Sequence, residues 1–130
     1  MEILRRANAQ HTDKPDGTKI DYYLFPEYEI HYNEIPSGTT QVWHHHEKIE
    51  ETLLILDGEL EARWKDENSQ EQKTLVRKGD LIRTGNTPHT FANTSSASVS
   101  FVVFKLVLSG VSHQDIFKND KIIDPTEHIK

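Results

Sequence analysis

The residues with the clearest chemical potential are three consecutive histidines, His44, His45 and His46, followed by two carboxylates, Glu50 and Glu51. Side chains alternate between the two faces of a strand, so His44 and His46 point one way and His45 points the other. Two imidazoles on one face, with a carboxylate shortly after them, can supply three ligands for a divalent metal ion. The sequence therefore predicts a metal site, with either glutamate as the carboxylate.

Two plainer interpretations of the histidine run compete with a metal site. A purification tag is one, but tags lie at the ends of a chain and this run is internal. A solvated polar loop is the other. The spacing of the residues around the run decides between these interpretations.

The histidines belong to a longer pattern of glycine, five residues, histidine, any residue, histidine, four residues, glutamate, six residues and glycine. Its fixed positions are Gly38, His44, His46, Glu51 and Gly58. This pattern resembles the first motif of the cupin superfamily. The resemblance favours Glu51, since Glu50 would lie one residue too far from Gly58.

A second stretch resembles the second cupin motif, which begins with glycine and ends with histidine, three residues and asparagine. Gly79 opens it, and His89 and Asn93 close it. The family has proline and glycine where this chain has Gly85 and Thr87, and the interval from the glycine to the histidine is one residue short. We interpret this as a shortened turn, because residues 85–88 carry a strong turn signal.

The resemblance implies an all-β, single-domain cupin β-barrel, a double-stranded β-helix or jelly roll, with a metal site in its mouth. The implied metal ligands are His44, His46, Glu51 and His89. Glu51 is also the expected catalytic residue, since it is the one ligand that could loosen and take up a proton. Pocket-lining positions on the same faces are expected at Phe91, Leu53 and Ile55.

Runs of apolar, aromatic and β-branched residues between turn signals predict nine strands, of which residues 59–64 show a clear alternation of apolar and polar positions. They cover residues 22–25, 28–35, 40–46, 51–56, 59–64, 74–76, 81–84, 89–93 and 99–108. Short strands separated by turn signals are typical of a sandwich or barrel. We expect one domain over residues 1–130, with an N-terminal arm at 1–20, the barrel at 21–108 and a C-terminal tail at 109–130. The tail fits a swapped arm, a short helix or disorder.

Composition excludes several kinds of function. The formal charge of −6 disfavours non-specific nucleic-acid binding and attraction to an anionic membrane. The chain has no cysteine, so thiolate ligands and thiol nucleophiles are excluded. Neither a signal peptide nor an apolar membrane span is visible, and we therefore expect a soluble, cytoplasmic protein.

Histidine and carboxylate ligands suit Fe, Mn, Ni, Cu, Co or Zn rather than Ca or Mg. Three functions remain open: a metal-dependent enzyme on a small organic molecule, such as a dioxygenase or isomerase; a non-catalytic ligand-binding or sensing cupin; and an oligomerisation module with a structural metal or none. No Lys and Arg cluster lies beside the motif in the sequence, which disfavours a phosphosugar substrate. Cupins also imply a homodimer, with Leu54, Leu56 and residues 99–108 as candidate contacts.

Overall fold

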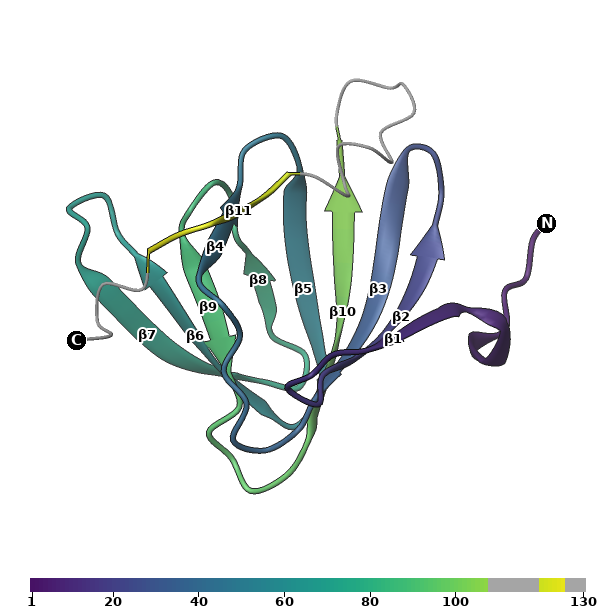
Figure 1. The fold of residues 1–130 in the computed structure, drawn as a ribbon, viewed down its shortest axis with the longest axis horizontal. Coiled ribbons are helices and arrows are strands. Elements are labelled where there is room, and N and C mark those ends of the chain that lie inside the picture. Colours follow the sequence, from purple (N-terminus) through teal and green to yellow (C-terminus); the bar gives the residue numbers. More distant parts are fainter. Residues whose placement is uncertain (108–119, 126–130) are drawn as a thin grey trace.

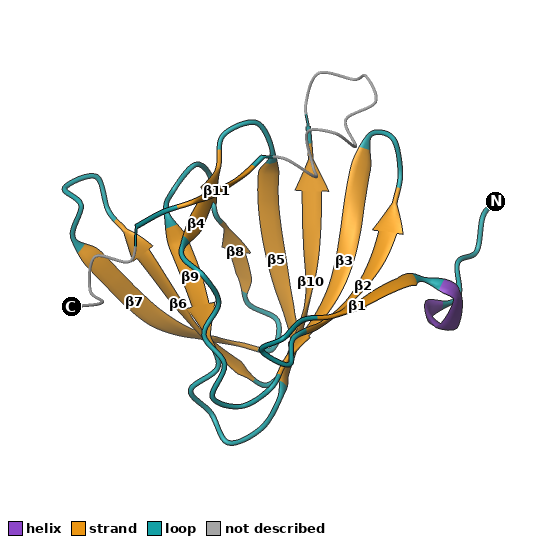
Figure 2. Cartoon of the chain, viewed as in Figure 1, coloured by secondary structure: helices purple, strands orange, loops and turns teal. Residues whose placement is uncertain are grey.

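The computed structural model of the protein describes residues 1–107 and 120–125, and strands dominate these residues (Figure 2). One short 3-10 helix, η1 (Arg6–Asn8), precedes them. The strands are β1 (Gln10–Asp13), β2 (Lys19–Leu24), β3 (Tyr28–Ile35), β4 (His44–His46), β5 (Glu50–Asp57), β6 (Glu59–Lys65), β7 (Glu71–Arg77), β8 (Leu81–Arg83), β9 (His89–Ala92), β10 (Val99–Leu106) and β11 (Lys121–Ile123). None of the helices in this part of the chain is long and apolar enough to cross a membrane.

The strands form two antiparallel sheets that face each other (Figure 1). The order in the six-stranded sheet is β1-β2-β3-β10-β5-β8, and in the five-stranded sheet it is β11-β4-β9-β6-β7. Strands distant in sequence thus become neighbours, as when β10 pairs with both β3 and β5. This architecture confirms the expected all-β fold.

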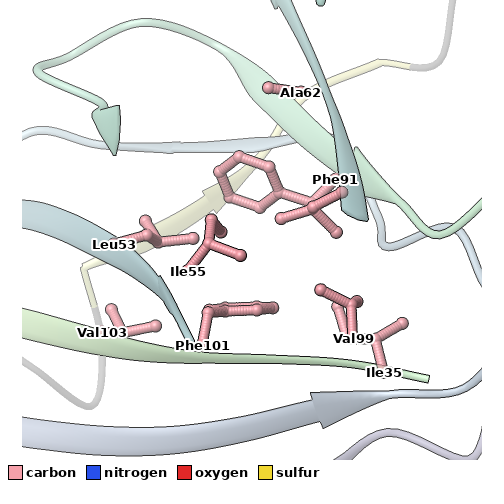
Figure 3. Packing of buried hydrophobic residues seen from close by; sticks show 9 residues of the cluster. Ile35, Leu53, Ile55, Ala62, Phe91, Val99, Phe101 and Val103 are labelled. Carbon is pink, nitrogen blue, oxygen red and sulfur yellow. The ribbon is translucent and has the colours of Figure 1, made fainter. Parts of the chain in front are cut away.

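The core lies between the inner faces of the two sheets. In β5, burial alternates along the strand, with Leu53 and Ile55 almost completely buried and Leu54 half-buried between them. Figure 3 shows Phe91 of the five-stranded sheet directed toward Leu53, Ile55 and Phe101 of the six-stranded sheet. The rings of Phe91 and Phe101 lie 6.4 Å apart between centroids. This packing fixes the separation of the sheets, and therefore the position of the strands that carry the histidines.

Several strand boundaries differ from the sequence prediction. The histidine strand is short, because before His44 the chain makes only an isolated bridge, at Thr40, and does not form a continuous ladder. By contrast, β7 begins at Glu71, earlier than predicted, since an edge strand needs no apolar side chains in order to pair with β6. Part of the expected N-terminal arm forms β1, which pairs with β2.

The expected C-terminal tail contains a strand that the sequence did not reveal. Residues 121–123 form β11, which pairs with β4 of the same chain, placing Lys121 opposite His46 and Ile123 opposite His44. The remainder of the tail, residues 109–119 and 126–130, lies outside the described residues. Residues 121–123 thus pair with the edge of the histidine strand that β9 leaves free.

Candidate metal centre

The central strand of the site, β4, lies between β9 and β11 in the five-stranded sheet. His44 pairs directly with His89 across the β4–β9 ladder, so residues from the two sequence motifs become neighbours. His44 and His46 are buried, whereas His45 is half-buried and bonds through Nδ1 to Asp124, 2.7 Å away. The alternation predicted for the three histidines is therefore confirmed.

Three side chains form a compact group with metal-ligand character. One ligand atom from each of His44, Glu51 and His89 lies within 4.8 Å of the others. All three side chains are buried. The imidazole centroids of His44 and His89 are 4.5 Å apart, and His89 Nε2 lies 3.6 Å from Glu51 Oε1. The shortened turn before His89 thus still delivers its ring to the group.

His46 lies beside this group. Its ring centroid is 5.2 Å from that of His44, and its Nε2 is 3.2 Å from Glu51 Oε2. Neither nitrogen of this ring makes a hydrogen bond among the described residues, although the side chain is only 1% exposed. A buried imidazole without a partner is unfavourable, and a metal ion beside Glu51 would relieve that cost.

The rings of His44 and His89 are oriented by the backbone. His44 Nδ1 donates to the carbonyl of Val42 at 2.9 Å, and His89 Nδ1 donates to the carbonyl of Thr87 at 2.7 Å. Because a carbonyl only accepts, both rings carry their proton on Nδ1 and leave the Nε2 lone pair free. Metal-binding histidines are typically held in this way by a backbone or carboxylate acceptor. The donor set therefore fits a transition metal.

The surroundings of His44 and Glu51 keep these two side chains in metal-binding protonation states. Burial, with a further contribution from the neighbouring His89 ring, lowers the pKa of His44 to about 3. Burial works to raise the pKa of Glu51, but His46, His89 and Lys105 outweigh it and hold that pKa well below its usual range. A neutral imidazole and an ionised carboxylate are the forms that bind a metal ion.

The choice between Glu50 and Glu51 is made by the pleat of β5. Glu51 is 5% exposed and faces inward toward the histidines. Glu50 is half-buried on the other face, where it forms an ion pair with Arg83 of the neighbouring strand. The carboxylate selected by motif spacing is thus the one on the histidine side.

A buried aspartate from the C-terminal segment anchors the connection between β4 and β5. Asp120 Oδ2 accepts backbone N–H bonds from Glu47, Lys48 and Ile49 at 3.1, 2.7 and 2.9 Å. This connection separates His46 from Glu51 in sequence, so Asp120 helps to fix their relative position. Sequence reasoning did not find this residue, because an aspartate 71 residues from Ile49 gives no local signal.

A cavity of about 850 Å³ opens beside the group, and His44, His46 and Glu51 are among its lining residues. The apolar part of its wall includes Leu53, Phe91, Phe101 and Val103. Ile55, expected in the pocket, is not among the described residues that line this cavity; it is buried one inward position further along β5 than Leu53. The volume is within the range of sites that bury a small organic ligand.

The cavity also contains polar residues that the sequence analysis did not single out. Glu29, His31 and Asn33 occupy successive inward positions of β3, and all three are buried. His31 reaches the cavity, whereas the next residue, Tyr32, faces the other side of β3 and packs under Arg6, whose Cζ lies 4.1 Å from the ring centroid. In the sequence, the apolar Ile35, two residues beyond Asn33 and on the same face of the strand, was the signal that this face points inward; Ile35 is buried in the structure.

Three lysines from separate parts of the chain, Lys14, Lys105 and Lys121, line the same cavity. Lys105 Nζ lies 3.6 Å from Glu51 Oε2. The sequence showed no basic cluster beside the histidine motif, and the structure corrects the conclusion drawn from it, because tertiary folding assembles positive charge there. The argument against a phosphosugar substrate, which rested on the lack of such a cluster, therefore no longer holds.

The all-β architecture, the two motifs and the convergent histidines define the class of protein. The family model described as Cupin domain matches residues 21–105, and the chain belongs to this family. A comparison with curated protein sequences found no match.

Solved structures with the same fold include several of different function. A variant of oxalate decarboxylase from B. subtilis aligns with a TM-score of 0.74 and 14% identity, over 93% of this chain and 32% of that one. The chain thus spans about a third of that enzyme. The polyketide cyclase RemF from Streptomyces resistomycificus aligns with a TM-score of 0.69 and 16% identity, over 82% of this chain and 79% of that one. The FeII form of HppE aligns with a TM-score of 0.66 and 14% identity, over 82% of this chain and 60% of that one.

Proposed function

We propose that the protein is a metal-binding cupin that acts on a small organic molecule, as a metal-dependent dioxygenase or isomerase. The observation that carries this proposal is the convergence of His44, Glu51 and His89 within 4.8 Å, with His44 and Glu51 also lining a cavity of about 850 Å³. Such a cavity gives a substrate access to the same side chains that would hold the metal. The FeII named for one structural neighbour is in keeping with this donor set.

The metal ligands in this proposal are His44, His46, Glu51 and His89. When bound, a divalent transition metal (Fe, Mn, Ni, Cu, Co or Zn) would supply Lewis acidity and, for the redox-active ions, reactivity with O₂. The two imidazoles anchored to backbone carbonyls stay fixed and present Nε2 to the site. Glu51 is the ligand suited to a second role, since its carboxylate can accept a proton from a substrate.

The surrounding residues bind and orient the substrate. Leu53 and Phe91 form an apolar wall next to the histidines, and the Phe91 ring lies 5.2 Å from the His89 ring between centroids. Lys105, 3.6 Å from Glu51, attracts an anionic group toward the metal centre. The site thus favours a small organic anion with an apolar part.

Metal analysis and turnover together test the proposal. Purified protein is expected to contain close to one transition metal per chain by elemental analysis. Oxygen consumption with enolic, phenolic and diketone substrates tests for a dioxygenase, and proton exchange with solvent, followed by NMR, tests for an isomerase. Glu51→Gln should abolish turnover, whereas Glu50→Gln, on the other face of the same strand, should retain it. Protein that binds no transition metal would contradict the proposal.

A non-catalytic ligand-binding or sensing cupin is the second candidate, and the lysines around the cavity favour it. Lys14, Lys105 and Lys121 provide positive charge that would retain an anion whether or not chemistry follows. This candidate predicts saturable binding of an organic acid that is recovered unchanged. If the metal has a purely structural role, removing it should leave ligand binding unchanged.

We propose further that the protein forms a homodimer through the outer face of the six-stranded sheet. Apolar side chains on this face are incompletely covered, with Phe104 42% and Leu81 60% exposed. Leu54 and Val102 pair across β5 and β10 on the same face. One chain has a mass of 15.0 kDa. Light scattering at micromolar concentration should give twice this mass for the wild-type protein and the mass of one chain for Phe104→Glu. A wild-type monomer would refute this proposal.

A further inference from the structure

The inner face of β3 carries a second cluster of buried polar side chains. Glu29, His31 and Asn33 are each 7 to 8% exposed and all three line the cavity. Positions on an inner sheet face are normally apolar, as Ile35 is at the end of the same strand. Burying three polar side chains is unfavourable unless their hydrogen-bonding groups are satisfied.

The cluster is only partly satisfied by the protein. His31 Nε2 lies 2.8 Å from Glu29 Oε1. A carboxylate only accepts, so this nitrogen carries the proton and donates it to Glu29. The imidazole also packs edge-on against Tyr22, with centroids 4.6 Å apart, and this contact fixes its orientation. Burial lowers the pKa of His31, which keeps the ring neutral.

Two acceptors then remain for a ligand. In the neutral ring, Nδ1 of His31 is an unprotonated acceptor, and it makes no hydrogen bond with any residue that the structure describes. Asn33 Oδ1 is buried and likewise lacks a hydrogen-bond partner within the described ranges. Asn33 Oδ1 therefore lacks a donor, and His31 Nδ1 is free to accept from one. A ligand hydroxyl group is a small uncharged donor that suits both atoms.

The position of this cluster relative to the metal centre sets the length of the ligand. In the sheet register, Glu29, Lys105 and Glu51 form one row across β3, β10 and β5, and His31, Val103 and Leu53 form the next row. His31 therefore lies two strands away from the strand of Glu51, about 10 Å across the sheet. A two-carbon diacid held at the metal centre is too short to reach it.

We propose that Glu29, His31 and Asn33 form a hydroxyl-binding subsite, and that the ligand is a hydroxylated organic acid longer than a two-carbon diacid. Its carboxylate lies toward Lys105 and the metal centre, and its distal hydroxyl donates to His31 Nδ1 or Asn33 Oδ1. This inference rests on the proposed function for the position of the carboxylate. Glu29 acts as a positioning residue, because its carboxylate fixes the tautomer of His31.

The test uses linear carboxylic acids of four to eight carbons, each with and without a terminal hydroxyl, titrated by calorimetry into zinc-loaded and metal-free protein. At the best-fitting length, the hydroxyl should lower Kd roughly 2- to 10-fold, the net value of one hydrogen bond. His31→Phe and Asn33→Leu should remove this preference while the unhydroxylated acid still binds. Tyr32→Phe, on the opposite face of β3, should retain it.

A measurement on the wild-type protein covers the case in which these variants do not fold. ¹⁵N NMR of the imidazoles should show His31 protonated at Nε2 and unprotonated at Nδ1, with the Nδ1 resonance shifting on addition of the hydroxy acid only. A hydroxyl preference in protein that binds no metal would refute the proposed function and support the subsite. Equal affinity for both members of every acid pair, in both forms of the protein, would overturn the subsite.

Discussion

Replacing single histidines of β4 tests the metal centre most directly. His46→Ala removes a buried imidazole 3.2 Å from Glu51 Oε2, whereas His45→Ala removes a half-buried one that faces Asp124. The two substitutions make the same chemical change one residue apart on opposite faces of one strand. Only His46→Ala should weaken metal binding.

The size of the effect follows from linkage between binding and folding. Metal at 100 times its Kd stabilises the folded state by about 2.7 kcal/mol. For 130 residues, an unfolding entropy of roughly 0.27 kcal/mol/K converts this into a rise in Tm of about 10 °C. Loss of a supporting residue around a metal typically weakens binding about 10- to 100-fold, and loss of a ligand should reach the upper end. At a 100-fold weaker Kd the stabilisation falls to about 0.4 kcal/mol, and the rise in Tm to about 1.5 °C.

The assay is thermal unfolding with and without a saturating transition metal, together with elemental analysis after desalting. Each variant is compared with its own metal-free form, so a general loss of stability does not affect the result. His45→Ala should keep the full rise in Tm. An equal loss of that rise in His45→Ala and His46→Ala would show that the face assignment of β4 is wrong.

Three further predictions concern pH, the β4–β5 connection and the core. The pKa of His44 is lowered to about 3 in the folded state, so its contribution to stability is complete above the unfolded value of about 6.5 and is lost as the pH falls toward 3. Metal-free protein should therefore unfold at lower urea concentrations at pH 5 than at pH 7. The substitution His44→Gln should reduce this difference. Asp120→Ala removes the acceptor of three backbone N–H groups, so it should lower the free energy of unfolding by about 3 kcal/mol and weaken metal binding. Asp124→Ala should leave metal binding unchanged. Urea titration measures the stability of each variant, and elemental analysis measures its bound metal. Phe101→Ala, at a position 1% exposed, should cost about 3 to 5 kcal/mol in urea unfolding, while the same change at the half-exposed Phe104 should cost much less.

The sequence predicted the fold class and much of the candidate metal centre because both are encoded locally. Alternation of apolar and polar residues identifies strands, and the fixed spacing between Gly38 and Gly58 identified His44, His46 and Glu51 without reference to the rest of the chain. The proximity of His89 to His44 was also expected, although only through the family resemblance. Strand boundaries were less accurate where strands are short or polar, as in β4 and β7, since pairing with a neighbour and not composition defines them.

The surroundings of the metal centre were decided by tertiary structure alone. His31 and Tyr32 were equivalent in the sequence, and the pairing of β3 with β10 determined which of them faces the cavity. Lys105 and Asp120 likewise act on Glu51 and on the β4–β5 connection from strands and segments far away in the chain. Local spacing determines which side chains can bind a metal, whereas the cavity around them results from long-range strand pairing, which leaves no trace in any single segment.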